Sequence, residues 1–335
     1  MQNRSVKCWG DTKRHNFENI NNYGDSITLE NLFLSWREFK KGKSKRKDVL
    51  EFEFNLEDNI FQLYQELINK TYKHSQYTSF FVQDPKLRHI HKAEVRDRIV
   101  HHLLSKYLND VYDKTFIHDS YSCRKNKGTH KAVDKLKTFS LKQSQNNKLN
   151  FCCLKCDVRR FFDSIDHRIL IDILKRKIKN DDILNLIKEI ILSFQTDRGI
   201  PLGNLTSQYF ANIYLNELDQ FVKHTLRIKY YVRYTDDFLM LDKSEGCLKD
   251  LIVPISYFLN NQLKLSLHPD KIIMRKYNQG IDFLGYVTLP YYRVLRTKTK
   301  KRIFRRINGR NIQSYLGVLK HCCGYKIENK IIDHD

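Results

Sequence analysis

Apolar residues along the chain follow two spacings, which predict two kinds of element. Recurrence every three or four positions predicts amphipathic helices, and it occurs at 29–39, 56–68, 95–108, 169–178, 182–193 and 208–226. Runs rich in β-branched and aromatic residues predict strands: two around an Asp-Pro turn at 80–90, one at 151–158, two within 228–243 and one at 281–289. This order of strands and helices predicts an α+β fold with an antiparallel sheet.

Polar and charged segments separate these elements. The chain opens with a polar stretch through about residue 22, and the basic run at 40–48 is either an RNA-contacting arm or a plain solvated loop. The turn-rich residues 140–150 predict a loop between lobes, and the basic segment beyond Tyr291 predicts a small helical lobe. Thr and Ser just before the helix at 208–226 are candidates for its N-terminal cap.

Composition indicates a folded protein with a polyanionic partner. The 335 residues are 41% hydrophobic and 12% aromatic, enough for two or three packed lobes. A formal net charge of +22, from 60 Lys and Arg against 38 Asp and Glu, favours nucleic acid first and an anionic membrane second. Because the chain shows no run of 18 apolar residues and no signal peptide, we expect a cytoplasmic protein without a membrane partner.

The eight cysteines predict reduced thiols, since no secretion signal accompanies them. One C-x-x-C pair, Cys153 and Cys156, lies inside an apolar run. That run lacks the turn residues of a zinc knuckle, and no second ligand pair follows it. We therefore interpret the pair as part of a buried strand.

Three carboxylates carry the candidate chemistry. Asp157 ends one predicted strand, and Asp236 and Asp237 stand at the tip of a predicted hairpin. If these strands pair, the carboxylates converge at one sheet edge, where their mutual repulsion is relieved by hard cations such as Mg²⁺. Two such ions promote in-line phosphoryl transfer. An Asp-Asp pair alone would more often be an ordinary acidic turn, so the surrounding sequence decides.

That surrounding sequence resembles the reverse transcriptases. YTDD at 234–237 is similar to their Tyr-x-Asp-Asp box, and FLGY at 283–286 resembles their primer-grip turn. Further matching segments, in the order of the family, are LRHIHKAEVRDRIVHHLL at 87–104, SCRKNKGTH at 122–130, CDVRRFFDSIDH at 156–167, GIPLGNLTSQYFANIYLNELD at 199–219 and LSLHPDK at 265–271. Together they span roughly residues 80–306, which makes the resemblance highly specific.

The resemblance implies a right-hand polymerase of fingers, palm and short helical thumb. Its limits here would be an N-terminal extension at 1–55, fingers at 56–150, a palm at 151–290 and a basic thumb at 291–335. The implied activity is RNA-directed DNA polymerisation with two Mg²⁺ ions, for which Mn²⁺ is a substitute. Asp157 and Asp236 would bind both ions, with Asp237 as a weaker third ligand and the carbonyl of Val158 as a helper.

The same resemblance assigns residues to the incoming dNTP. Lys86 and Arg88 match the finger cations that hold the triphosphate, and Phe162 matches the steric gate against a 2′-hydroxyl. Phe161 beside it leaves open which ring is the gate and which belongs to the core. Gly203, Gln208 and Lys271 complete the predicted dNTP site. Lys271 would equally fit a solvated surface charge.

Nucleic-acid contacts are predicted around the palm and thumb. The implied residues are Arg124, Tyr234, Gly285, Lys300, Lys301, Arg302, Arg305 and Arg306. For Arg124, a solvated surface charge is an equal alternative. The template RNA and the RNA/cDNA duplex are the partners that such contacts would serve.

One motif indicates a branch of the family. Most relatives have Gln-Gly-x-x-x-Ser-Pro between the two acids, whereas here Leu202 and Gln208 replace the Gln and the Pro. This pattern, with the short thumb, resembles the reverse transcriptases of diversity-generating retroelements. The resemblance implies errors at template adenines during mutagenic retrohoming, and a small basic accessory protein. Neutral drift at the two positions is the alternative.

Two other functions compete with this interpretation. A group II-like or antiviral-defence reverse transcriptase would share the acids and lack adenine mutagenesis. A non-catalytic RNA-binding protein would explain the charge and leave the intact acids unexplained.

Overall fold

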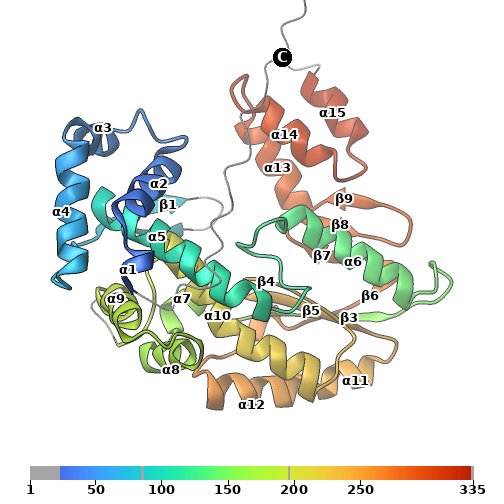
Figure 1. Cartoon of the computed structure of the whole chain (residues 1–335). Helices are drawn as coiled ribbons and strands as arrows, with labels where there is room; N and C mark the ends of the chain where they lie inside the picture. Colours follow the sequence, from blue (N-terminus) through green and yellow to red (C-terminus); the bar gives the residue numbers. More distant parts are fainter. Residues whose placement is uncertain (1–22, 84–86, 195–196, 333–335) are drawn as a thin grey trace, which may run out of the picture.

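The computed structural model describes residues 23–83, 87–194 and 197–332. Figure 1 shows a helical N-terminal part with a β-hairpin, a central sheet flanked by helices, and a C-terminal part of short strands and helices. The sequence predicts this α+β composition, and the predicted antiparallel sheet is confirmed. Among the described residues, no helix is long and apolar enough to span a membrane.

The N-terminal part is built on amphipathic helices. Thr28 caps α2 by accepting a hydrogen bond from the Asn31 N–H at 3.1 Å. The predicted finger strands form an antiparallel hairpin, β1 to β2, with Thr78 opposite Lys92. The elements are α1 (Tyr23–Ser26), α2 (Leu29–Lys40), α3 (Lys47–Phe54), α4 (Leu56–Ile68), β1 (Thr78–Gln83), β2 (Leu87–Lys92) and α5 (Val95–Tyr112).

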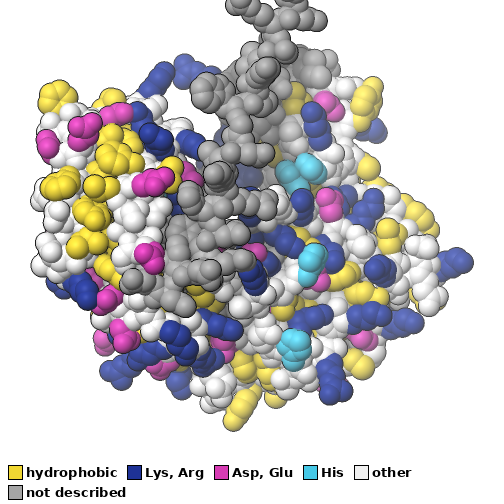
Figure 2. All heavy atoms as spheres, viewed as in Figure 1, with side chains coloured by type: hydrophobic (Ala, Val, Ile, Leu, Met, Phe, Trp, Pro, Cys, Tyr) yellow, Lys and Arg dark blue, Asp and Glu magenta, His cyan; other side chains and the backbone are white. Residues whose placement is uncertain are grey.

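The outer surface of this part differs from the rest of the basic protein. Figure 2 shows hydrophobic and acidic side chains over the region of α3 and α4, where Leu50, Phe54 and Phe61 are exposed. Lys and Arg side chains gather over the lower and right-hand parts of the same view.

The central sheet has the strand order β4-β5-β3-β6, and its described pairs are antiparallel. Because side chains alternate along a strand, Leu154 and Cys156 enter one core, whereas Cys153 enters the other. This burial confirms the two cysteines as strand residues. The strands are β3 (Cys152–Asp157), β4 (Tyr230–Tyr234), β5 (Asp237–Asp242) and β6 (Ile273–Lys276).

Helices cover both faces of this sheet. They are α6 (Thr129–Gln143), α7 (Phe161–Ser164), α8 (His167–Lys177), α9 (Asp181–Leu192), α10 (Leu205–Gln220), α11 (Glu245–Asp250) and α12 (Ile252–Gln262). A π-helical turn, Phe221–Thr225, follows α10. Single 3-10 turns occur at Asp113–Thr115, Pro269–Lys271 and Tyr277–Gln279.

Two local predictions in this region were wrong. The loop expected at 140–150 is shorter, because α6 continues to Gln143 and packs on β4 and β5. The expected Thr and Ser caps lie inside α10, where Thr206 and Ser207 are buried and Asn204 takes the N-cap position. Thr206 instead pairs through its hydroxyl with His101 Nδ1 at 2.6 Å.

The C-terminal part contains a second sheet, of order β7-β8-β9. The single strand expected at 281–289 is a hairpin, because Leu284 and Gly285 turn the chain at φ values of 50° and 90°. The predicted basic helical lobe follows. The elements are β7 (Ile281–Phe283), β8 (Tyr286–Thr288), β9 (Arg293–Leu295), α13 (Thr297–Arg306), α14 (Ile312–Leu319) and α15 (Tyr325–Ile332).

Candidate active site

The predicted acidic residues meet at one end of the central sheet. β3 ends at Asp157 and β5 begins at Asp237, and the strand register sets these two residues opposite each other. Asp236 lies in the two-residue turn between β4 and β5, and its carbonyl accepts a hydrogen bond from the Val158 N–H at 3.3 Å. The predicted convergence of the two acidic segments is therefore confirmed. We call the residues Thr235 and Asp236 the carboxylate turn.

A buried ion pair supports the carboxylate turn from behind. The Arg233 guanidinium and the Asp219 carboxylate are both fully buried, with Nη2–Oδ2 at 2.5 Å and Nε–Oδ1 at 2.7 Å. Tyr231 donates to the same carboxylate at 2.8 Å. Arg233 Nη1 also donates to the Thr235 carbonyl at 3.0 Å, which fixes the turn at its left-handed residue, φ 53°.

Sequence reasoning missed this pair. The only local signal is an arginine within an otherwise apolar strand, and nothing in the sequence connects it to an aspartate on α10.

Two lysines neutralise two of the carboxylates. Lys155 Nζ lies 3.0 Å from Asp237 Oδ2, and Lys271 Nζ lies 2.5 Å from Asp157 Oδ1. Burial raises the pKa of Asp237 to about 6; Lys155 opposes the rise, and the other two aspartates add to it. Burial and the charge of Asp157 raise the pKa of Asp236, with partial offsets from Lys271 and Arg88. The site therefore carries an excess of negative charge.

This donor set fits a hard divalent cation. All three groups are carboxylates, and Asp237 Oδ1 is buried without a hydrogen-bond partner among the described residues. No three His, Cys, Asp or Glu side chains of the described chain are already arranged as a ligand set. Lys271 occupies one oxygen of Asp157, Oδ1.

The two adjacent phenylalanines have different environments. Phe161 is 2% exposed and belongs to the core, whereas Phe162 is half-buried at its edge. Their rings meet edge to face, with centroids 5.4 Å apart. The sequence did not decide whether Phe161 or Phe162 is the steric gate, and Phe162 is the one accessible to a ligand.

The loop before α10 is tied to the finger hairpin. The His91 N–H donates to the Leu202 carbonyl at 2.9 Å, and Asn204 Nδ2 donates to the His91 carbonyl at 3.0 Å. Gly203 between them has φ 114°, and a Cβ there would lie 2.9 Å from Ile90 Cγ2. Only glycine fits this close approach. Gln208 lies exposed on the first turn of α10.

The predicted finger and palm contacts have mixed outcomes. Lys86 lies outside the described residues, and Arg88 is exposed on β2. The Tyr234 hydroxyl accepts a hydrogen bond from Thr129 Oγ1 at 3.3 Å.

Arg124, a predicted nucleic-acid contact, has partners inside the protein. Its side chain is 8% exposed and pairs with Asp113 Oδ1 at 2.6 Å. It also donates to the Ile117 and Ser120 carbonyls. These internal partners hold the Arg124 side chain, and its contact with nucleic acid remains a prediction.

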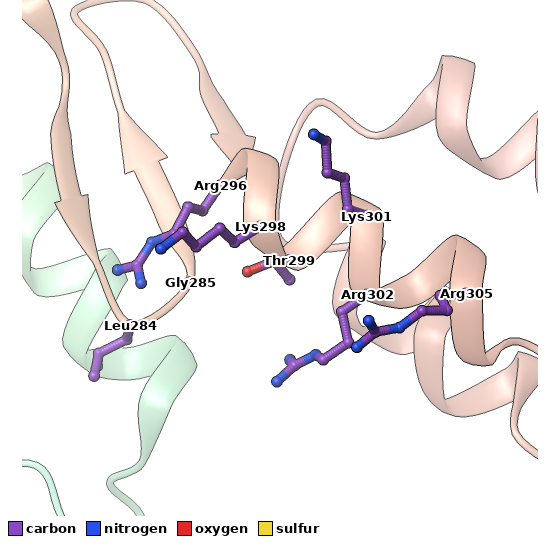
Figure 3. Close-up of a pocket in the computed structure, with 8 residues that line it drawn as sticks. All are labelled: Leu284, Gly285, Arg296, Lys298, Thr299, Lys301, Arg302 and Arg305. Atoms are coloured by element: carbon purple, nitrogen blue, oxygen red, sulfur yellow. The ribbon is translucent and has the colours of Figure 1, made fainter. Parts of the chain in front are cut away.

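A basic pocket lies where the primer-grip resemblance placed a turn. We call Leu284 and Gly285 the primer turn. The pocket has a volume of about 760 Å³ and is lined by Leu284, Gly285, Arg296, Lys298, Thr299, Lys301, Arg302 and Arg305. Figure 3 shows the Arg296 and Lys298 side chains beside the primer turn, and Arg302 and Arg305 extending from α13.

Only some of the thumb residues predicted to contact nucleic acid line this pocket. Lys300 and Arg306 do not line it, and Arg306 Nη2 instead donates to the Gln83 carbonyl of β1 at 3.2 Å. Arg296, Lys298 and Thr299 were missed by the sequence analysis, because their approach to the primer turn depends on how β9 leads into α13.

This fold and site define a class of protein. An antiparallel sheet with carboxylates at one end, between a β-hairpin-bearing lobe and a basic helical lobe, is the architecture of the right-hand polymerases. Residues 73–288 match the family described as reverse transcriptase (RNA-dependent DNA polymerase). The chain belongs to this family.

Curated relatives include intron-encoded proteins. The chain is 23% identical over 257 residues to the putative COX1/OXI3 intron 2 protein of Saccharomyces cerevisiae, covering 57% of this chain and 29% of that protein. It is 24% identical over 241 residues to protein YkfC of Escherichia coli, covering 60% and 63%. It is also 24% identical over 322 residues to the group II intron-encoded protein LtrA of Lactococcus lactis, covering 73% and 51%. The chain thus spans less than two thirds of each relative.

Solved structures agree on the fold. Apo telomerase from Candida tropicalis, truncated from its C-terminal domain, superposes with a TM-score of 0.53 at 13% identity, over 70% of this chain and 59% of that one. This likeness confirms the right-hand polymerase fold.

Proposed function

We propose that this protein copies a template RNA into cDNA by two-metal phosphoryl transfer. The observation that carries the proposal is the register that sets Asp157 opposite Asp237, with Asp236 in the adjoining turn. Asp157 and Asp236 would hold the ions, with Asp237 and the Val158 carbonyl as weaker ligands. Bound Mg²⁺ would stabilise charge on the attacking and leaving oxygens. Template RNA, the RNA/cDNA duplex and dNTPs are the proposed partners, and Mn²⁺ would substitute for Mg²⁺.

Lys271 and Arg88 would receive the triphosphate. Lys271 already lies on Asp157, so an incoming dNTP would draw its ammonium group onto phosphate oxygens and free the carboxylate. Arg88 on β2 approaches the same site from the fingers, since its charge acts on Asp236. An Arg fork and a Lys point charge are suited to phosphate oxygens. Lys86 lies outside the described residues, so its role in holding the triphosphate remains a prediction.

Phe162 would exclude ribonucleotides. Its ring is half-buried at the edge of the core that Phe161 fills, so truncating it opens space without emptying the core. We expect Phe162→Ala to raise rNTP incorporation relative to dNTP at least about tenfold, a difference of roughly 1.4 kcal/mol in transition-state binding. Single-nucleotide extension kinetics measure it. An unchanged ratio would remove Phe162 as the gate, and Phe258→Ala on α12 serves as a control.

The finer proposal concerns fidelity and biological context. We propose that the protein makes errors at template adenines, as in a diversity-generating retroelement, together with a small basic accessory protein. Its support is Leu202 and Gln208 in place of Gln and Pro. Leu202 lacks the amide that Gln would offer for hydrogen bonding. Its backbone is joined to the finger hairpin at His91, so the substitution lies where fingers and palm meet.

Sequencing of cDNA tests this proposal. With the cognate RNA and accessory protein supplied, we expect misincorporation at template adenines to exceed that at other bases several-fold. Leu202→Gln with Gln208→Pro should lower the adenine errors selectively; residue 208 is the fourth residue of α10. Equal errors at all four bases would favour a group II-like or defence enzyme. Absence of metal-dependent dNTP incorporation would favour a non-catalytic RNA-binding protein.

A further inference from the structure

One lysine connects the carboxylate turn with the second sheet. Lys155 lies on β3, two residues before Asp157, and its side chain is 17% exposed. Its ammonium group lies 3.0 Å from Asp237 Oδ2 and donates to the Asp282 carbonyl on β7 at 3.1 Å. The same group lies over the Phe283 ring, 5.7 Å from its centroid. Lys155 therefore contacts a candidate metal ligand and the strand that leads into the primer turn.

Asp282 is also held from the thumb. Its Oδ1 accepts hydrogen bonds from the Arg296 guanidinium, including one from Nε at 2.7 Å. The Arg296 N–H donates to the Gly285 carbonyl at 2.9 Å, and Arg296 is the N-cap residue of α13. Figure 3 shows its side chain at the edge of the basic pocket. A continuous set of contacts thus runs from Asp237 through Lys155, Asp282 and Arg296 to the pocket.

The two sheets share no strand. The carboxylate turn belongs to the β4-β5-β3-β6 sheet, whereas the primer turn belongs to the β7-β8-β9 sheet. Their relative position depends on contacts between them, and Lys155 supplies a direct one at the reacting end. A counterion for Asp237 would need no second bond to a main-chain carbonyl on the other sheet. The geometry therefore favours a link over charge compensation alone.

We propose that Lys155 is a positioning residue that fixes the primer turn relative to the carboxylate turn, so that a primer strand held in the basic pocket presents its 3′ end to the metal ligands. This inference rests on the proposed polymerase function. A misplacement of about 1 Å between reacting groups lowers rates roughly a hundredfold. A half-buried ammonium group that contacts both sheets would limit such a displacement.

The first test is kinetic and uses the full chain. Lys155→Met keeps the side-chain length and removes the donors. We expect kcat to fall about tenfold to a hundredfold with the dNTP KM nearly unchanged. Lys223→Met, which also removes a lysine that donates to main-chain carbonyls, should leave both constants as in the wild type. A Lys155→Met enzyme with normal kcat would overturn the proposal, whereas an inactive wild type would overturn the polymerase function instead.

The second test separates positioning from charge compensation without relying on activity. A 2-aminopurine at the primer 3′ end reports its placement by fluorescence, here measured in EDTA. We expect Lys155→Met to change that signal. Lys155→Met combined with Asp237→Asn removes the carboxylate that Lys155 would otherwise leave without its partner, so it should fold even if the single variant does not. The changed signal should persist in this double variant. If the fluorescence of the double variant returned to the wild-type value, Lys155 would serve only as a counterion.

Discussion

The carboxylate turn and the primer turn are both two-residue turns supported by an Arg–Asp ion pair. The pair is buried in the first case and partly exposed in the second. Both connect antiparallel strands through two residues. Thr235 has a positive φ in the carboxylate turn, and both Leu284 and Gly285 have one in the primer turn. The carboxylate turn rests on the fully buried pair of Arg233 and Asp219. The primer turn is held by the pair of Arg296 and Asp282, whose side chains are 35% and 46% exposed.

The difference follows from what each turn is proposed to hold. A buried ion pair stabilises little relative to an apolar pair, but losing one partner is costly, so it enforces one geometry. An accessible pair contributes at most about 1 kcal/mol and rearranges easily. The turn for the metal ligands is thus fixed by the interior, whereas the turn for a moving nucleic-acid strand is held at a surface.

The largest expected effect is chemical and lies on the carboxylate turn. Asp236→Asn removes one charge from the metal ligands, so primer extension should fall at least about a thousandfold, in the range seen when transition-state charge loses a preorganised partner. Because burial already raises the pKa of Asp236, the variant should melt no lower than the wild type. Asp250→Asn, an exposed acid on α11, is the matched control. Substantial activity in Asp236→Asn would exclude the metal-site assignment.

The second effect is on stability and tests the buried support. Arg233→Met leaves Asp219 buried without its partner, and we expect the free energy of unfolding to fall by about 3–5 kcal/mol. Chemical denaturation measures it. Arg176→Met, which breaks an exposed pair with Glu217, should cost at most about 1 kcal/mol. Adding Asp219→Leu to Arg233→Met should recover part of the loss. If Arg233→Met and Arg176→Met lowered the free energy of unfolding equally, burial of the ion pair would not distinguish the two turns.

The smallest effect concerns the primer side and is electrostatic. Neutralising Lys300, Lys301, Arg302, Arg305 and Arg306 together should reduce the slope of log affinity against log salt by up to about 3.5 for single-stranded RNA, at roughly 0.7 per lost phosphate contact. Fluorescence anisotropy across a salt series measures it. Neutralising the exposed residues Arg168, Lys175, Lys177 and Lys179 should change the slope less. If both sets flatten the slope equally, α13 has no special role in binding nucleic acid.

The sequence predicted the elements of the site better than their supports. Asp157, Asp236 and Asp237 could be placed together because strand ends and turns leave local signals that pairing then brings to one edge. The ion pair of Arg124 with Asp113 could not be predicted, since a sequence shows a basic residue and not its internal partners. The hairpin at 281–289 was predicted as one strand, because its turn contains Leu284, a residue that usually avoids left-handed backbone.

By itself, the sequence determined the α+β composition, the basic charge, the family and the identity of the acids, since all of these are properties of local pattern. Only the tertiary structure decided which of the two adjacent phenylalanines is buried in the core, which ion pair lies behind the carboxylate turn, and that Lys155 contacts both sheets. These outcomes depend on side chains far apart in the chain, whose burial and pairing arise when the elements pack. The spacing of residues predicts helices and strands because these repeat regularly along the chain. A contact between distant segments produces no such repeat, so it cannot be predicted from spacing.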